Sequence, residues 1–312
     1  MKAQPQGQGR PLIFGEVLFD TFPDGARVLG GAPFNVAWHL QGFGEAPLFV
    51  SAVGADRQGE EVLDLMRAWG LDTRGVQVHE AHPTGKVAVT LRDGQPSYDI
   101  VSHQAYDYIS LSGVEEAIRG VRVSLLYHGS LAVRHDTSRQ TLARLRAQLA
   151  IPRCVDVNLR APWWRRETVL DDVAGAYCVK LNDGELMELT APGEGAEDDL
   201  RAAAAALLEQ SGMQVLIVTR GEQGAMVLTA DETLRGDPVV VEEVVDTVGA
   251  GDAFSAVVLL GMQRGWEWPD ILRRALAFAA RICRVRGATL EDRGLYTAFL
   301  EAWTEDGRGR GR

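Results

Sequence analysis

The stretch that decides the fold lies at residues 246–255 and reads Asp-Thr-Val-Gly-Ala-Gly-Asp-Ala-Phe-Ser. The apolar run before it, 239–245, predicts a strand, and the apolar run 253–260 predicts a buried helix. A glycine-bearing turn between a strand and a helix brings several backbone N–H groups to one point, where the helix dipole also favours negative charge. The stretch therefore predicts a site for a phosphate group or a developing oxyanion.

Asp252 has two interpretations in this turn. As an N-cap, its carboxylate would accept the free N–H groups of the helix. As a general base, it would take a proton beside the anion site, and the two glycines, the hydroxyl of Thr247 and the second carboxylate of Asp246 favour this interpretation. We therefore expect Asp252 to be the catalytic base, next to an anion hole made by the N–H groups of three residues, Gly249, Ala250 and Gly251.

Length and composition are those of an ordinary globular protein, with 312 residues, 46% hydrophobic and 24% charged. The net charge of -11 argues against general nucleic-acid binding, which needs a clustered basic surface, but not against a single bound nucleotide. The three cysteines are scattered and suit neither a disulfide framework nor a zinc site. The first ten residues lack the apolar core of a signal peptide, and no run approaches the ~18 apolar residues of a membrane span. These features predict a cytoplasmic protein with no membrane segment.

Strands and helices alternate from residue 45 to 300, which predicts one α/β domain, residues 11–304, with a mainly parallel sheet. The polar ends, 1–10 and 305–312, are expected to be disordered. A strand over 11–19 and a short one at 27–29 precede a hairpin, 86–91 with 98–101, whose turn is Asp93-Gly94. A hairpin between βα units makes sense as a separate small sheet over the site, so the segments 17–33 and 84–104 are expected to form a lid. The exposed edge of such a sheet invites a second copy, which predicts a homodimer through the lid.

Two stretches together resemble the signatures of the ribokinase-like, or PfkB, carbohydrate kinases. One is 246–255, and the other is Gly-Gly-Ala-Pro-Phe-Asn-Val-Ala at 30–37, which precedes it in the expected order. The resemblance covers roughly residues 10–300 and implies a doubly wound, mostly parallel sheet flanked by helices, with a small β-sheet lid. It also implies an ATP-dependent enzyme that transfers the γ-phosphoryl group of MgATP to a sugar hydroxyl.

Weaker matches lie in the middle of the chain. Asp156-x-Asn158-x-Arg160 resembles the fructokinase and 2-keto-3-deoxygluconate kinase variant, in which the Arg lies near the transferred phosphate; a surface ion pair is the alternative for Arg160. Asn182-x-x-Glu185 resembles the element that orders water and Mg²⁺, although the same pattern is typical of a capping box.

By the same resemblance, further residues are assigned to ligands. The sugar would contact Asp20, Gly30, Gly31, Asn35 and Asp252, and the nucleotide would contact Asn182, Thr219, Gly221, Gly224, Gly249 and Gly251. Glu185 and Asn182 would hold Mg²⁺, largely through water, and a monovalent cation such as K⁺ would lie beside Asp246. His128, for which no partner can be identified, is expected to be packed rather than catalytic.

The acceptor is left open between several small molecules. The 156–160 motif together with Gly129-Ser130 favours fructose, but the segment 98–107 lacks the aromatic–Arg pair usual in fructokinase lids. A keto acid would need an extra cation, which the lid stretch offers only as Arg92, and a nucleoside would need an aromatic side chain for stacking. 2-Keto-3-deoxygluconate, ribose and nucleosides stay as alternatives, as does a non-catalytic sensor of sugar or nucleotide. A Rossmann-type oxidoreductase is disfavoured because Phe254 takes the place of the third glycine.

Overall fold

The computed structural model describes residues 8–92, 95–190 and 197–309. Within these residues a nine-stranded sheet has the order β13-β12-β11-β10-β9-β8-β1-β4-β5 and is parallel except at one edge, where β12 and β13 run antiparallel. The strands are β1 (Arg10–Phe14), β4 (Leu48–Gly54), β5 (Val76–His79), β8 (Val123–His128), β9 (Arg153–Asp156), β10 (Cys178–Asn182), β11 (Val215–Thr219), β12 (Ala225–Leu228) and β13 (Thr233–Gly236).

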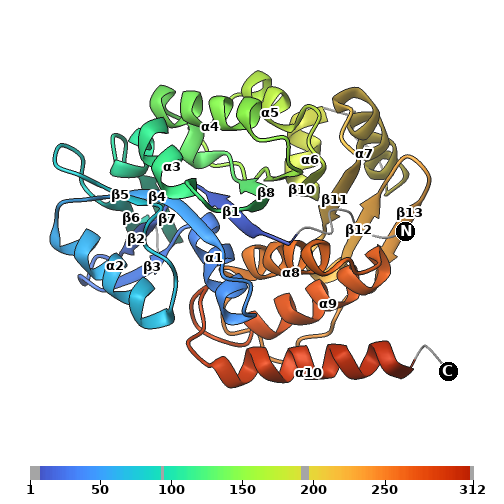
Figure 1. Cartoon of the computed structure of the whole chain (residues 1–312). Coiled ribbons are helices and arrows are strands. Elements are labelled where there is room, and N and C mark those ends of the chain that lie inside the picture. Colours follow the sequence, from blue (N-terminus) through green and yellow to red (C-terminus); the bar gives the residue numbers. More distant parts are fainter. Residues whose placement is uncertain (1–7, 93–94, 191–196, 310–312) are drawn as a thin grey trace.

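Helices cover both faces of this sheet, as Figure 1 shows, and make a three-layer domain. One face carries α1 (Ala32–Gly42), α2 (Arg57–Trp69), α8 (Ala250–Arg264), α9 (Trp268–Ile282) and α10 (Arg293–Gly309). The other carries α3 (Leu111–Ile118), α4 (Asp136–Gln148), α5 (Arg166–Val173), α6 (Asp183–Thr190) and α7 (Glu197–Ser211). Because both faces are covered, the central strands are nearly continuous apolar runs, and every residue of β4 is buried. The predicted α/β class and ribokinase-like layering are confirmed.

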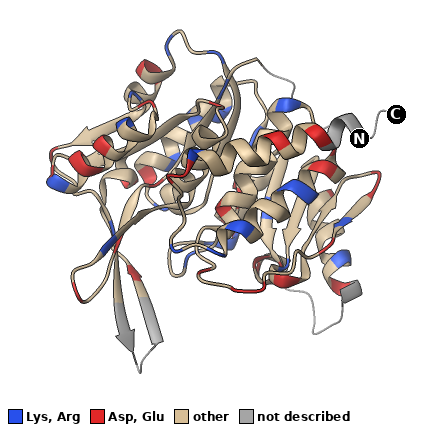
Figure 2. Ribbon diagram, turned by 90° about the horizontal axis from the view of Figure 1, so that it is seen from below, with Lys and Arg blue, Asp and Glu red and all other residues tan. Residues whose placement is uncertain are grey.

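A second, four-stranded sheet has the order β3-β2-β6-β7 and is built from the two segments predicted for the lid. Its strands are β2 (Leu18–Thr21), β3 (Arg27–Gly30), β6 (Gly85–Arg92) and β7 (Gln95–Ile100). β2 pairs in parallel with β6, so two segments far apart in the chain build one sheet, and the tan parts of β6 and β7 project from the main domain in Figure 2. The predicted turn at Asp93-Gly94 lies outside the described residues.

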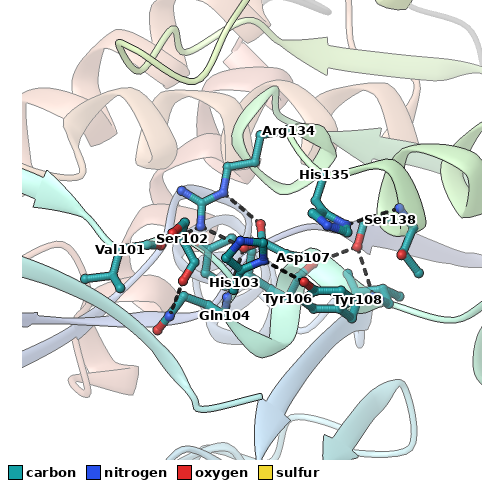
Figure 3. A network of polar contacts seen from close by, with 12 residues as sticks. Val101, Ser102, His103, Gln104, Tyr106, Asp107, Tyr108, Arg134, His135 and Ser138 are labelled. Atoms are coloured by element: carbon teal, nitrogen blue, oxygen red, sulfur yellow. Dashed lines mark hydrogen bonds and ion pairs between the residues drawn. The ribbon is translucent and has the colours of Figure 1, made fainter. Parts of the chain in front are cut away.

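Arg134 anchors the chain where it returns from the lid to the main domain (Figure 3). Its Nε and Nη2 donate to the two carboxylate oxygens of Asp107 at 2.7 and 2.8 Å, and Nη2 also donates to the carbonyl oxygen of Val101 at 2.6 Å. Asp107 lies in η1 (Ala105–Tyr108), and both charged side chains are almost completely buried. This ion pair therefore fixes the lid's return strand to the body of the protein.

Three sequence predictions about elements need correction. The strand predicted at 239–245 is wrong: this segment is irregular, and four of its five valines are exposed, Val240 by 86 %. Among the described residues β13 is the edge of the sheet, so no neighbouring strand is available to pair with this segment. The strand predicted over 11–19 is two strands, β1 in the main sheet and β2 in the lid.

The third difference concerns the ends, where regular structure reaches into segments expected to be disordered. β1 begins at Arg10, and α10 continues to Gly309 because its apolar face buries Tyr296 and Trp303 in the core. Among the described residues, no helix is long and apolar enough to cross a membrane.

Candidate active site

The first turn of α8 provides the predicted anion corner. Gly249 is the N-cap with φ 79°, and a Cβ there would lie 2.3 Å from Cβ of Ala288, so both the backbone conformation and the space require glycine. The N–H of Ala250 donates to the Thr247 carbonyl at a long 3.3 Å. Within the described chain, the N–H groups of Gly249, Gly251 and Asp252 have no acceptor. Two of the three N–H groups predicted for the hole, those of Gly249 and Gly251, are therefore free, and the N–H of Asp252 is free in addition.

Asp252 is the third residue of α8 and does not act as its cap. The helix has no side-chain cap, and the Asp252 carboxylate instead accepts a hydrogen bond of 2.7 Å from Nδ2 of Asn35 on α1. Burial raises the pKa of Asp252 to about 6; the bond from Asn35 and the charges of Lys180 and Arg160 oppose this, and Asp156 adds to it. A carboxylate with such a pKa is ionised at neutral pH yet basic enough to take a proton.

The N-terminus of α1 brings the residues predicted for the sugar to the same corner. Gly31 caps the helix with φ 110°, and a Cβ there would lie 2.6 Å from the backbone oxygen of Glu16, so glycine is required. Asn35 keeps a second polar atom, Oδ1, that is buried and has no partner among the described residues. Gly30, by contrast, has open space where a side chain would go, so the structure gives no packing reason for glycine there.

Arg160 is a positive charge that acts on several acidic side chains of the site. It lowers the pKa of Asp20 and of Asp252, in both cases against a larger upward effect of burial. Asp20 lies on β2 of the lid, so this interaction joins the lid to the loop after β9. Arg160 makes no ion pair with any described residue; its Nη1 donates to the Leu159 carbonyl at 2.9 Å. The surface ion-pair interpretation therefore finds no partner in the described chain.

Glu16 is a buried carboxylate that the sequence analysis missed. It is 3 % exposed, and burial raises its pKa to about 7, with Arg160 acting against burial and Asp252 adding to it. Its Oε2 has no partner within the described residues. A lone glutamate inside the apolar run 11–19 was the available signal.

The residues predicted for the nucleotide meet at the carboxyl ends of β10 and β11, where Asn182 pairs in register with Thr219. Asn182 and Glu185 form the capping box: Oδ1 of Asn182 accepts from the Glu185 N–H at 2.8 Å, and Glu185 accepts from the Asn182 N–H at 2.9 Å. The other oxygen of Glu185 accepts from the N–H of Leu159 at 2.8 Å, next to Arg160. The capping box and the predicted role in ordering water and Mg²⁺ are therefore compatible. The cap places Asn182 and Glu185 at the carboxyl ends of the strands, where ligands bind in such sheets.

The turn after β11 contains the two remaining glycines. Gly221 has φ 52°, and a Cβ on Gly224 would lie 2.2 Å from the carbonyl oxygen of Gly236. Close packing of β12 against β13 is therefore sufficient reason for Gly224, while Gly221 needs only its backbone conformation.

The described residues around the predicted Mg²⁺ site do not form a complete set of metal ligands. In the described part of the chain, no group of three His, Cys, Asp or Glu side chains could hold a metal ion. The oxygens of Glu185 already accept backbone N–H groups, and those of Asp246 accept from Val248 at 3.0 Å and from Gly287 at 3.2 Å. Such a set fits Mg²⁺ held mainly by phosphates and water, which is the usual manner for this ion.

Lys180 and Asp156 form a second charged group that the sequence analysis did not predict. Nζ of Lys180 lies 3.1 and 2.9 Å from the two carboxylate oxygens of Asp156. Oδ2 of Asp156 also accepts from Ser255 at 2.9 Å and from Tyr127 at 3.2 Å. The lone lysine in the buried strand β10 was the signal. His128, in contrast, is packed as predicted, and burial lowers its pKa to about 3.

A doubly wound α/β domain with free amides at a helix N-terminus, a basic carboxylate beside them and a β-sheet lid defines a phosphotransferase for a small acceptor. The family of pfkB carbohydrate kinases matches this chain over residues 16–293, and the chain belongs to that family. It is therefore a sugar kinase.

Relatives of known name agree with this assignment. Fructokinase-2 of Oryza sativa subsp. japonica is 29% identical over 293 residues, which cover 86% of this chain and 85% of the relative. The solved structure of a fructokinase with bound ATP from Xylella fastidiosa has a TM-score of 0.80 at 23% identity, covering 95% and 99% of the two chains. A fructokinase from Vibrio cholerae, solved with fructose, ADP and a potassium ion, has a TM-score of 0.75 at 24% identity, covering 95% and 100%. At these identities the solved structures establish the ribokinase-like fold.

Proposed function

We propose that this sugar kinase phosphorylates fructose, with Asp252 as the general base and the free amides at the start of α8 as the anion hole. The observation that carries the proposal is the hydrogen bond of 2.7 Å between Asn35 and Asp252. It joins the helix assigned to the sugar with the helix assigned to the phosphate, although the two residues are 217 positions apart.

In the proposed reaction a sugar hydroxyl oxygen attacks the γ-phosphorus of ATP. The new O–P bond forms while the bond from phosphorus to the β–γ bridging oxygen breaks, and ADP leaves with that electron pair. Asp252 takes the hydroxyl proton, a step that contributes about 10²–10⁴ in rate for a positioned base. Each amide aimed at the transferred group contributes about 3 kcal/mol, and Arg160 adds positive charge.

Cations are assigned to the nucleotide side of the site. Mg²⁺, when bound, would neutralise charge on the phosphates, and Asn182 with Glu185 would hold its water molecules. The nucleotide would lie along Thr219 and Gly221 beyond them, and K⁺ would lie beside Asp246, where the turn 246–249 meets Gly287.

The choice of fructose is supported by the names of the relatives and by the charge of the pocket. Arg134 is a cation near the lid that sequence analysis did not place there, but Asp107 neutralises it with two hydrogen bonds. Arg134 therefore does not supply a second free positive charge beside Arg160. A keto acid would need such a charge, so a neutral sugar fits better.

The test is an ADP-release screen of the purified protein with fructose, ribose, 2-keto-3-deoxygluconate, fructose phosphates and adenosine. We expect the highest kcat/KM with fructose, at least about tenfold above any other acceptor. A higher kcat/KM for another acceptor refutes fructose but leaves the kinase assignment intact. ADP release with none of them would favour the non-catalytic sensor.

We further propose a homodimer that forms through the lid. Its sheet exposes Val28 on β3 and Tyr98 on β7, by 41 % and 57 %, and an open edge of this kind favours pairing. Light scattering after size exclusion should give twice the mass of 34.0 kDa, and Tyr98→Lys should shift the protein toward the monomer. A wild-type protein that elutes at a single chain's mass at high micromolar concentration would exclude the dimer.

A further inference from the structure

Lys180 lies directly under the backbone of the anion corner. Its side chain is only 14 % exposed, and its Nζ is 3.2 Å from the point where a Cβ on Gly251 would be. Gly251 is one of the residues whose N–H is free at the start of α8. A phosphoryl group held by this N–H would therefore lie next to an ammonium group as well.

The ammonium group has one hydrogen more than its protein partner uses. A lysine ammonium donates three N–H bonds. Asp156 accepts from Nζ with both carboxylate oxygens, at 2.9 and 3.1 Å, and no other acceptor contacts Nζ in the described part of the chain. One N–H is therefore left for a ligand on the Gly251 side.

The ion pair places this group between two parts of the site. On β10, Lys180 comes two residues before Asn182, which is assigned to the nucleotide. Its partner Asp156 accepts from Ser255 on α8, the helix that also carries Asp252. The ammonium group therefore lies where the strand of the nucleotide side meets the helix of the acceptor side.

We infer that Lys180 is a catalytic residue that donates its third N–H to the phosphoryl group during transfer. This inference rests on the proposed transfer at Asp252. In the transition state the negative charge is spread over the three equatorial oxygens of the transferring group. A fixed cation at that point stabilises the transition state more than bound ATP, so it increases kcat rather than the affinity for either substrate.

A purely structural role for Lys180 is the alternative, because its pair with Asp156 braces β9 against β10. Ser255 on α8 provides the matched control. Its hydroxyl donates to the same oxygen of Asp156 at the same distance, 2.9 Å, but it carries no charge. If bracing Asp156 were the whole role, Ser255→Ala and removal of Lys180 would have similar effects.

The experiment compares wild type, Lys180→Met, Ser255→Ala and the double variant Lys180→Met/Asp156→Asn. The double variant is included because Lys180→Met alone leaves a buried carboxylate unpaired and can prevent folding, whereas removal of both charges is often neutral. Steady-state kinetics with the best acceptor give kcat and KM. Calorimetry gives the affinity for ADP alone and for ADP with aluminium fluoride, which mimics the transferring phosphoryl group.

We expect kcat of the folded Lys180 variants to fall about 10²–10³-fold, as when one donor to the developing charge is removed. KM and the affinity for ADP should stay within about threefold of wild type, while the affinity for ADP with aluminium fluoride should fall with kcat. Ser255→Ala should keep kcat within about threefold.

A double variant that folds and keeps kcat within tenfold of wild type would overturn the inference. So would an equal loss of affinity for ADP with and without aluminium fluoride, which would make Lys180 a nucleotide-positioning residue. These results concern an active wild type and leave the proposed function standing. A wild type that is inactive with every acceptor would refute both.

Discussion

Replacing Asp252 by Asn should remove most of the activity and at the same time stabilise the protein at alkaline pH. Asn has the same shape and can still accept the hydrogen bond from Asn35, but it cannot take a proton. We expect kcat to fall by about 10²–10⁴, with KM for sugar and ATP little changed.

The expected stabilisation follows from the raised pKa of Asp252. Burial holds this pKa at about 6 in the folded protein, against an ordinary value of 3.8. The folded state therefore binds the proton more tightly than the unfolded state, so the contribution to stability is complete below pH 3.8 and is lost as the pH rises through about 6. At pH 8 the ionised Asp252 costs up to about 3 kcal/mol, or about 2 kcal/mol after allowing for its partial exposure, and Asn avoids this cost.

Urea unfolding at pH 5 and pH 8 measures this effect. The free energy of unfolding of Asp252→Asn should exceed that of wild type at pH 8, and the difference should shrink by about half at pH 5. The control is Asp246→Asn. In the wild type both carboxylate oxygens of Asp246 accept backbone N–H groups, so this variant should lower the free energy of unfolding by about 1 kcal/mol. An Asp252→Asn protein that is less stable than wild type at pH 8, or retains normal kcat, would refute the reasoning.

Three further predictions concern the surroundings of the site. Gly249→Ala should lower kcat at least about tenfold, because the new methyl group would lie 2.3 and 2.5 Å from Cβ and Cα of Ala288 and the backbone there has φ 79°; a kcat within about threefold of wild type in the ADP-release assay would contradict this. Arg160→Met should move the acid limb of the kcat/KM–pH profile upward, since Arg160 lowers the pKa of Asp252; an unmoved limb would show that the charge does not act there. Asp107→Asn should lower the free energy of unfolding by about 3–5 kcal/mol, because it leaves Arg134 charged and buried, and a loss below 1 kcal/mol in urea titrations would contradict this.

The sequence was sufficient for elements whose pattern is local. The apolar runs 215–219 and 225–228, each bounded by polar or glycine residues, predict two short strands, and β11 and β12 have these bounds. The lid was predicted because a hairpin does not belong in a run of βα units. The valine-rich run 239–245 failed because an apolar composition predicts a strand only where a neighbouring strand is available.

The site was predictable where motifs carry it and not where tertiary packing does. The residues of the two glycine motifs meet as expected through Asn35 and Asp252. Glu16, between β1 and β2, and Lys180, in β10, are single charged residues within apolar runs, and nothing local to them tells a buried ion from a tolerated exception. Only tertiary contacts place them at the site: the backbone of Glu16 lies against Gly31 at the start of α1, and Nζ of Lys180 lies next to Gly251 at the start of α8.

The five residues of β1 connect two parts of the main sheet, since this strand lies between β8 and β4. Within the described residues, the strands β4 and β5 have no other hydrogen-bonded strand between them and the remaining six. During synthesis β1 can pair with β4 first, but the two parts of the sheet can join only after β8 (Val123–His128) has been made. Removing the first fifteen residues, β1 included, should accordingly divide the main sheet into two parts, β4–β5 and β8–β13, that no hydrogen-bonded strand joins.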